Sequence, residues 1–380
     1  MRRNVLFVFL PMLVSVLGAC GDDATGPDDR DTGDPVPTGT DLRAVTTGGG
    51  HACALLASGA AFCWGRNRDG QVGDGSRVNR HTPVPIAADT AFRAISAGWT
   101  HTCAVDMAGA AFCWGENSGG QLGDGTREPR PTPVPVTGEA RFQSIHAGWF
   151  HTCGLTLDGE ALCWGSIDSG ALDLPPEPVP VAQGLRFRQL GTADSLVCGL
   201  TVDDEVYCWG KIFAAEWMSS PLRLADGLVG HRIATGAGFV CWLNPAGSSS
   251  CLLGIDAIPD LGFHGPYETP TGLPPFARLA AGVYPLCGLA SDGRAFCWSM
   301  TDAWRWGQDE HPEEPPPFSE PTEMPSPPLA SLHRSWGFSC GLGLVDMPAT
   351  QVYCWGSNGD GQLGDGTAEV SDVAVRVLLP

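Results

Sequence analysis

The fifteen cysteines of this chain constrain its fold more than any other feature. Fourteen of them fall into seven pairs, six of them ten residues apart and the last fourteen apart: Cys53 with Cys63, Cys103 with Cys113, Cys153 with Cys163, Cys198 with Cys208, Cys241 with Cys251, Cys287 with Cys297 and Cys340 with Cys354. The residues within a pair read as strand, turn, strand, which places the two cysteines opposite each other in a hairpin, within reach of a disulfide. Zinc and redox sites use closer spacings such as C-x2-C, so the pattern predicts seven disulfide-closed hairpins.

Each cysteine pair belongs to a longer repeat, which is clearest in residues 91–136. The second cysteine recurs every 43 to 57 residues, and each copy holds three or four short β-rich runs between Gly, Asp and Pro turns. This spacing is typical of one propeller blade. The sequence therefore predicts an all-β, seven-bladed β-propeller over residues 41–380, with four-stranded antiparallel blades and one disulfide per blade. A monomer is expected.

The N-terminus predicts export and lipid anchoring. Arg2 and Arg3 precede an apolar run from Val5 to Leu17 that is too short to span a bilayer, and Leu17-Gly18-Ala19-Cys20 resembles the bacterial lipobox. Residues 1–19 are thus interpreted as a lipoprotein signal peptide, Cys20 as the lipidated residue, and 20–40 as a disordered tether. The alternative is an ordinary secretory peptide with Cys20 in its tail. Because Gly21 replaces the Asp of inner-membrane retention signals, the outer membrane or cell surface is the predicted location.

The repeat resembles a known family. His51-Ala-Cys-Ala-Leu55, Phe62-Cys-Trp-Gly65 and Gln71-Val-Gly-Asp-Gly75 resemble the regulator-of-chromosome-condensation repeat, and the resemblance extends over nearly all of 41–380. It implies a seven-bladed propeller that is closed by pairing between the two chain ends. The family's founder is a nucleotide exchange factor on chromatin, and a secreted bacterial member inhibits β-lactamases.

The charge and the export signal argue against both the exchange-factor role and the chromatin role. The net charge is −20, and removal of Arg2 and Arg3 with the leader leaves 20 basic against 42 acidic residues, a charge of −22. Nucleic acid binding depends on Lys and Arg neutralising phosphates, so no nucleic acid partner is expected. Plant photoreceptors of the family use repeated Gly-Trp-Arg-His-Thr motifs. Gly98–Thr102 and Gly148–Thr152 match these only in part, both lack the Arg, and no third copy with the Trp is identified.

Variation between the copies points to one face of the propeller. Copies 1, 2 and 7 keep a GQxGDG loop at Gln71, Gln121 and Gln362, whereas copies 3 to 6 lose it. The atypical loops of copies 4 to 6 are rich in aromatic residues and should be neighbours, as in a binding hot spot. The predicted surface for a protein or envelope glycan partner consists of Phe213, Trp217, Phe263, His264, Tyr267, Trp304, Arg305 and Trp306. The alternative is drift, with these aromatics filling gaps under irregular loops.

The remaining chemistry-bearing residues predict neither a metal site nor an active site. His51, His101 and His151 stand two residues before a cysteine in adjacent copies, and hydrogen bonds to a neighbouring backbone are predicted for them in preference to zinc. The Asp-Gly pairs of the loops read as turns with positive φ, not calcium loops. Catalytic motifs such as G-x-S-x-G and H-E-x-x-H are absent, so a binding protein without a cofactor is predicted. The alternative is a secreted hydrolase or an enzyme inhibitor with its site on the loop face.

Overall fold

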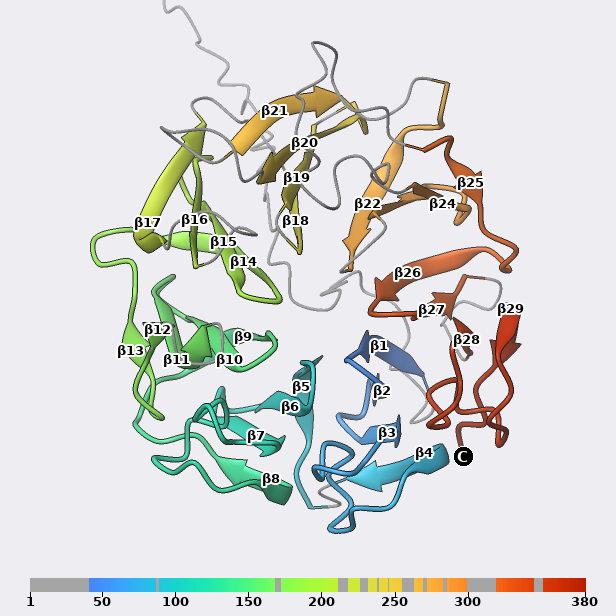
Figure 1. The fold of residues 1–380 in the computed structure, drawn as a ribbon, viewed down its shortest axis with the longest axis horizontal. Helices are drawn as coiled ribbons and strands as arrows, with labels where there is room; N and C mark the ends of the chain where they lie inside the picture. The colour runs from blue at the N-terminus through green and yellow to red at the C-terminus, as the bar shows by residue number, and fades with distance from the viewer. Residues whose placement is uncertain are drawn as a thin grey trace, which may run out of the picture.

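The computed structural model describes residues 41–86, 89–167, 172–210, 218–225, 232–237, 239–244, 246–254, 263–268, 272–282, 286–298, 319–344 and 351–380. All regular elements within these ranges are β-strands, and they form seven antiparallel sheets arranged around a central axis (Figure 1). The predicted seven-bladed propeller is therefore confirmed.

Each blade is built from consecutive strands, the first of which lies nearest the axis (Figure 1). Blade 1 consists of β1 (Leu42–Thr47), β2 (His51–Leu56), β3 (Ala61–Gly65) and β4 (Arg80–Ile86). Blade 2 consists of β5 (Phe92–Ala97), β6 (His101–Asp106), β7 (Ala111–Gly115) and β8 (Arg130–Pro135). Blade 3 consists of β9 (Phe142–Ala147), β10 (His151–Thr156), β11 (Ala161–Ile167) and a split outer strand, β12 (Leu172–Asp173) and β13 (Val179–Pro180).

The other four blades follow the same order. Blade 4 consists of β14 (Phe187–Ala193), β15 (Leu196–Thr201), β16 (Val206–Gly210) and β17 (Met218–Ala225). Blade 5 consists of β18 (Arg232–Gly236), β19 (Phe239–Leu243), β20 (Ser249–Gly254) and β21 (Phe263–Glu268). Blade 6 consists of β22 (Phe276–Ala281), β23 (Leu286–Ala290), β24 (Ala295–Trp298) and β25 (Thr322–Glu323). Blade 7 consists of β26 (Leu329–Arg334), β27 (Phe338–Gly343), β28 (Val352–Gly356) and β29 (Ser371–Arg376).

A disulfide joins the second and third strands of every blade, and the predicted pairing is confirmed throughout. In order from blade 1 to blade 7, the bridges join Cys53 to Cys63, Cys103 to Cys113, Cys153 to Cys163, Cys198 to Cys208, Cys241 to Cys251, Cys287 to Cys297 and Cys340 to Cys354. The two cysteines of each bridge are register partners in their hairpin. Their Cα atoms lie 4.0–4.1 Å apart in all seven bridges.

These bridges stabilise small sheets. In the chain-entropy account, each one contributes about 2–3 kcal/mol by restricting the unfolded chain. The longer turn in the last hairpin, between Cys340 and Cys354, includes residues 345–350, which lie outside the described residues. The register of that hairpin is nevertheless the same as in the other six, since its two cysteines face each other in the same way.

The hydrophobic core lies between the blades. Each cluster of buried apolar residues draws on two neighbouring sheets, for example Phe92 and Trp114 of blade 2 with Cys53 and Leu55 of blade 1. A single sheet of this size buries too little apolar surface to be stable alone, so each blade depends on its neighbours.

The ring is closed by contacts between two complete blades, so the implied pairing of the chain ends within one sheet is wrong. Strands β1 to β4 form one sheet and β26 to β29 another, and neither sheet combines strands from the two ends. Instead, Trp64 Nε1 donates to the carbonyl of Gln362 (2.9 Å), and the Gly366 amide donates to the carbonyl of His81 (2.9 Å). The two blades also share a core cluster that includes Val45 and Phe338. Because blade 7 keeps the GQxGDG loop, it packs on blade 1 as blade 1 packs on blade 2.

The GQxGDG loops have the turn chemistry expected from their sequence. In the first loop Gly70, Gly73 and Gly75 all have positive φ, a conformation that glycine adopts without steric cost. Partial burial opposes ionisation of Asp74, yet hydrogen bonds that its carboxylate accepts within the loop lower its pKa below the ordinary value. The carboxylate is thus already hydrogen-bonded within the protein, as the turn interpretation predicts.

Among the residues that the structure describes, no helical segment has the length and apolar composition that a membrane span requires. The predicted signal peptide, Cys20 and the tether all lie outside these residues, as does the boundary that separates them from the propeller at residue 41.

Candidate functional site

The surface predicted on blades 4 to 6 falls largely outside the described residues. This applies to Phe213, Trp217, Trp304, Arg305 and Trp306. The backbone of Phe263, His264 and Tyr267 is described and forms β21, the outer strand of blade 5, whereas a loop was expected there. The structure leaves this surface a prediction.

A different group of aromatic side chains gathers at one mouth of the central channel. Trp99, Trp149 and Trp336 each lie in the turn that joins the first and second strands of a blade. The ring centroids of Trp99 and Trp149 are 5.1 Å apart, and those of Trp99 and Trp336 are 5.8 Å apart with the rings nearly perpendicular. Trp336 is 55% exposed, although tryptophan usually loses most of its surface to the core. We call these three residues the mouth tryptophans.

Gly49 allows the mouth tryptophans to meet across blade 1. Blade 1 separates Trp336 on blade 7 from Trp99 on blade 2, and its own residue at the equivalent position is Gly49. A Cβ atom on Gly49 would lie 2.5 Å from the Trp99 carbonyl oxygen and 2.7 Å from its indole ring. The Trp99 ring therefore lies over Gly49, a position that any side chain there would obstruct.

Trp336 is a third copy of the motif's tryptophan, so the expectation that only two copies carry it is wrong. Trp336 stands four residues before Cys340, just as Trp99 precedes Cys103 and Trp149 precedes Cys153. Ser335 replaces the glycine of the motif and Gly337 follows the tryptophan, so a search for Gly-Trp passes over it. A search for tryptophan four residues before the first cysteine of each pair finds it.

The turns carrying Trp99 and Trp149 border a cavity of about 90 Å³ at the channel mouth. Its lining includes small residues of several blades, among them Gly48, Gly98 and Gly148. Two charged residues line the same cavity, Asp194 on blade 4 and Arg334 on blade 7. Burial raises the pKa of the Asp194 carboxyl to about 7 and lowers the pKa of the Arg334 guanidinium to about 10. The cavity thus combines aromatic rings, small residues and one group of each charge.

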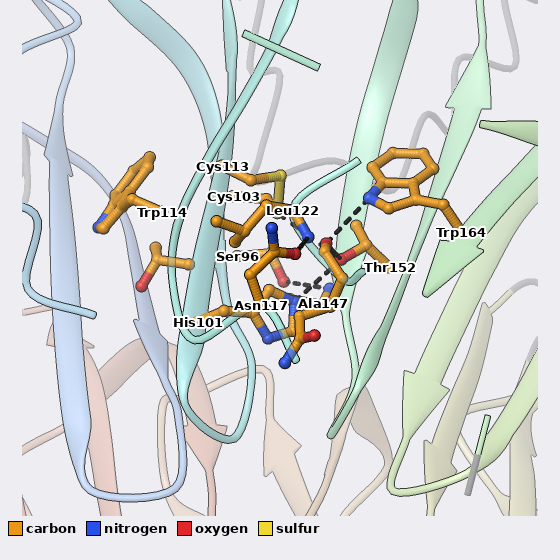
Figure 2. Close-up of a disulfide and its surroundings, with 12 residues drawn as sticks. Ser96, His101, Cys103, Cys113, Trp114, Asn117, Leu122, Ala147, Thr152 and Trp164 are labelled. Carbon is orange, nitrogen blue, oxygen red and sulfur yellow. Dashed lines mark hydrogen bonds between the residues drawn. A yellow bond between two sulfur atoms is a disulfide. The ribbon is translucent and has the colours of Figure 1, made fainter. Parts of the chain in front are cut away.

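The three histidines that precede the first cysteines of blades 1 to 3 lie deeper, between the blades. His51 Nε2 bonds Thr102 Oγ1 of the next blade (2.8 Å), and His101 Nε2 bonds Thr152 Oγ1 (2.9 Å; Figure 2). The partner is therefore a side-chain hydroxyl, and the predicted backbone partner is wrong. In both cases the threonine hydroxyl donates its proton to the backbone carbonyl of a glutamine, for example Thr152 to Gln121 at 2.8 Å. Because that proton is already used, the histidine must be the donor through Nε2.

These histidines are held neutral. Burial lowers the pKa of His51 and His101 to about 3 and that of His151 to about 4. A proton on Nδ1 would have no acceptor, because Nδ1 of all three rings is buried without a hydrogen-bond partner among the described residues. Nor do the described residues bring three or more His, Cys, Asp or Glu side chains together in a group that could hold a metal ion.

Comparison with known families identifies the repeat of the first three blades. Residues 58–105 and 108–155 match the regulator of chromosome condensation (RCC1) repeat. A second description of the same repeat matches residues 43–71, 92–121 and 142–170. The matched residues thus lie in blades 1 to 3. Trp99 and Trp149 lie within these matched repeats, whereas Trp336, Asp194 and Arg334 lie in later blades, so the channel mouth combines matched and diverged copies.

Solved structures of other proteins share the propeller fold. Prp20p from Saccharomyces cerevisiae is 19% identical, with a TM-score of 0.67 over 83% of this chain and 85% of that one. Human WBSCR16 is 17% identical, with a TM-score of 0.54 over 91% and 84%. The CRINKLY WD40 ectodomain of the Arabidopsis thaliana receptor kinase ACR4 is 19% identical, with a TM-score of 0.54 over 83% and 96%. At these identities the similarity establishes the fold alone.

Proposed function

We propose that this chain is an exported, lipid-anchored propeller that binds a protein partner at the channel mouth and catalyses no reaction. The proposal rests on the mouth tryptophans. They form a contiguous aromatic surface with one ring more than half exposed, and tryptophan is among the residues that contribute most to protein interfaces.

The architecture supports a binding role. Hydrogen bonds between neighbouring blades hold two of the turns that carry the tryptophans, since the Trp99 amide donates to the Gly148 carbonyl (3.0 Å) and the Trp149 amide to the Asp194 carbonyl (3.2 Å). Less conformational entropy is lost when a partner docks on turns that are already ordered. Propellers of the same fold bind proteins: the structure of Prp20p was described with its binding to Gsp1p and histones, and Kap60 has been seen bound to yeast RCC1 (Prp20). The net charge of −20 argues against a nucleic acid partner, because nucleic acid binding depends on Lys and Arg neutralising phosphates.

Capture of the partner from native envelopes tests this function. The full-length, affinity-tagged chain would be purified from detergent extracts, and co-purifying proteins identified by mass spectrometry. Combined Trp99→Ala, Trp149→Ala and Trp336→Ala substitutions should abolish capture. The matched control replaces Met107, Leu157 and Val202, which are exposed apolar residues of hairpin turns at the opposite ends of the second strands, by Ala.

The outcomes distinguish the two candidate surfaces. Loss of capture in the mouth variant, with the control unchanged and thermal unfolding of both near wild type, supports the proposal. Capture that survives in the mouth variant but is lost on replacing Trp217, Trp304 and Trp306 by Ala would assign binding to blades 4 to 6. Sedimentation with purified envelope glycan, unaffected by the mouth substitutions, would count against a protein partner.

The anchor is tested separately. Replacing Cys20 with Ser should prevent incorporation of a palmitate analogue and release the chain from the membrane fraction, because a lipid chain supplies the hydrophobic attachment. An unlabelled wild-type chain recovered in the soluble fraction would contradict the lipoprotein interpretation and leave the propeller's binding role standing.

A further inference from the structure

Asp194 occupies an unusual position at the channel mouth. It stands at the repeat position that tryptophan occupies in blades 2, 3 and 7, four residues before Cys198. Its φ is 40°, in a region that residues other than glycine rarely adopt. Its carbonyl accepts a hydrogen bond from the Trp149 amide at 3.2 Å, which ties the turn of blade 4 to the turn that carries Trp149. A strained backbone of this kind often marks a functional position.

The Asp194 carboxylate lacks a partner of opposite charge among the described residues. Its Oδ1 is buried and makes no hydrogen bond to any of them, whereas buried carboxylates are normally hydrogen-bonded. Arg334 lines the same cavity, yet no ion pair forms between these two described side chains, and Arg334 donates instead to the Ser339 hydroxyl at 2.9 Å. Burial without a compensating cation raises the pKa of Asp194 to about 7.

We propose that the cavity binds a positively charged side chain of the partner, a lysine or an arginine, between the Asp194 carboxylate and the indole rings of Trp99 and Trp149. This inference rests on the proposed function and deepens it. An ammonium or guanidinium group would supply the cation that Asp194 lacks, and the faces of indole rings attract cations. The net charge of −20 also steers basic partners towards the protein.

Binding of this kind depends on pH with a defined sign. The cation requires an ionised Asp194, and ionisation increases as the pH rises through about 7, so affinity should rise over the same interval. Arg334 remains cationic throughout. Arg66 and Glu116, on the loops next to the mouth, each have partners of their own, Asp69 at 4.0 Å and the Ser118 amide at 2.7 Å. The buried histidines stay neutral because burial lowers their pKa to about 3–4: His51, His101, His146, His151 and His333.

Calorimetric titration of the full chain with three synthetic peptides tests the proposal. The probes are hexapeptides in which glycine alternates with lysine, with uncharged norleucine or with glutamate. The lysine peptide should bind about tenfold more tightly at pH 8 than at pH 6, which is the change in the ionised fraction of a group with a pKa of about 7. The norleucine peptide should bind much more weakly at both values.

Two variants separate the contributions of charge and aromatic rings. Asp194→Asn, which keeps the size of the side chain, should remove both the lysine preference and the pH dependence. Gly49→Ala should displace the Trp99 ring and weaken binding severalfold at pH 8 while the pH dependence persists. The matched control is Asp158→Asn, an exposed carboxylate in a hairpin turn remote from the mouth, which should leave binding unchanged.

Several results would overturn the inference. Equal binding of the lysine and norleucine peptides, preference for the glutamate peptide, or an unchanged lysine preference in Asp194→Asn would each exclude a cation site at Asp194. If Asp194→Asn still captures the envelope partner as wild type does, while the triple mouth variant does not, the cation inference fails and the protein-binding function stands.

Discussion

Six of the seven junctions between blades have a tryptophan after the second cysteine and fall into two kinds, whereas blade 5 has Leu252 at that position. Where the preceding blade carries the GQxGDG loop, a glutamine carbonyl accepts the indole N–H of the next blade: Gln362 from Trp64, Gln71 from Trp114 and Gln121 from Trp164, all within 2.9–3.0 Å. Where the loop is missing, Nε1 of Trp209, Trp298 and Trp355 is buried with no hydrogen-bond partner among the described residues. The tryptophans are retained in both kinds of junction, but their acceptors are not.

This difference shows that the tryptophan stays buried whether or not its indole N–H has a hydrogen-bond acceptor. A buried donor without a partner costs about 1–3 kcal/mol, so the junctions into blades 4, 6 and 7 should be weaker than those into blades 1, 2 and 3. The histidines differ in the same way. His101 Nε2 bonds Thr152 of the next blade, but the residue that corresponds to Thr152 in blade 4 is Val197. Neither ring nitrogen of His151 therefore has a hydrogen-bond partner within the described part of the chain. The buried indole N–H groups are thus hydrogen-bonded at the junctions that join blades 7, 1, 2 and 3, and unpaired at the junctions into blades 4, 6 and 7 within the described residues.

The largest predicted effect comes from dismantling one strong junction. The buried Asn117 side chain donates to Asp124 and to the carbonyls of Thr126 and Glu128, and it accepts from the Leu122 amide. Asn117→Ala should therefore cost about 3 kcal/mol in the free energy of unfolding, measured by urea denaturation with the disulfides intact. Ser118→Ala, at an exposed neighbouring position, should have an effect close to zero. Equal stability of the two variants would mean that the loop contributes little to the junction.

The second largest predicted effect is a loss of folding stability at acidic pH. His51, His101 and His151 accept a proton near pH 6.5 when unfolded but only at about pH 3–4 when folded, so the unfolded state binds more protons between these values. Stability should fall as the pH drops from 6.5 towards 4, by about 1.4 kcal/mol per pH unit for each histidine. Burial also lowers the pKa of His146 and His333 to about 4, so five histidines contribute to this slope. His101→Leu, which introduces the residue found at this position in blade 4, should therefore reduce the histidine contribution to the slope by about one fifth. An unaltered slope in urea unfolding between pH 4 and 6.5 would contradict buried neutral histidines.

The smallest predicted effects come from substitutions at one repeat position, which is Thr152 in blade 3 and Val197 in blade 4. Thr152→Val removes the partner of His101 and should destabilise the protein by about 1–2 kcal/mol, because it leaves a buried N–H unpaired. Val197→Thr offers His151 a hydroxyl and should be neutral or stabilising by up to about 1 kcal/mol. Amide hydrogen exchange in β10 and β15 measures both changes locally. Destabilisation by both substitutions would show that the site tolerates only the residue that is present.

The sequence by itself determined the number of blades, the disulfide pairing and the positions of the GQxGDG loops. These are local properties: Cys103 and Cys113 meet in one hairpin, and Gly120 and Gly123 shape one turn, so short-range spacing is sufficient to predict them. The leader and the aromatic surface of blades 4 to 6 remain predictions.

Only the tertiary structure decided how the ring closes and what lies at its centre. Trp336 and Trp99 are separated by more than 230 positions in the chain, and they meet because blade 7 returns to blade 1 and Gly49 leaves space between them. Asp194 became a candidate for the same reason, since its burial and its missing partner depend on side chains from other blades. Repeat spacing specifies each sheet, whereas the chemistry of the channel mouth arises from residues that closure of the ring brings together.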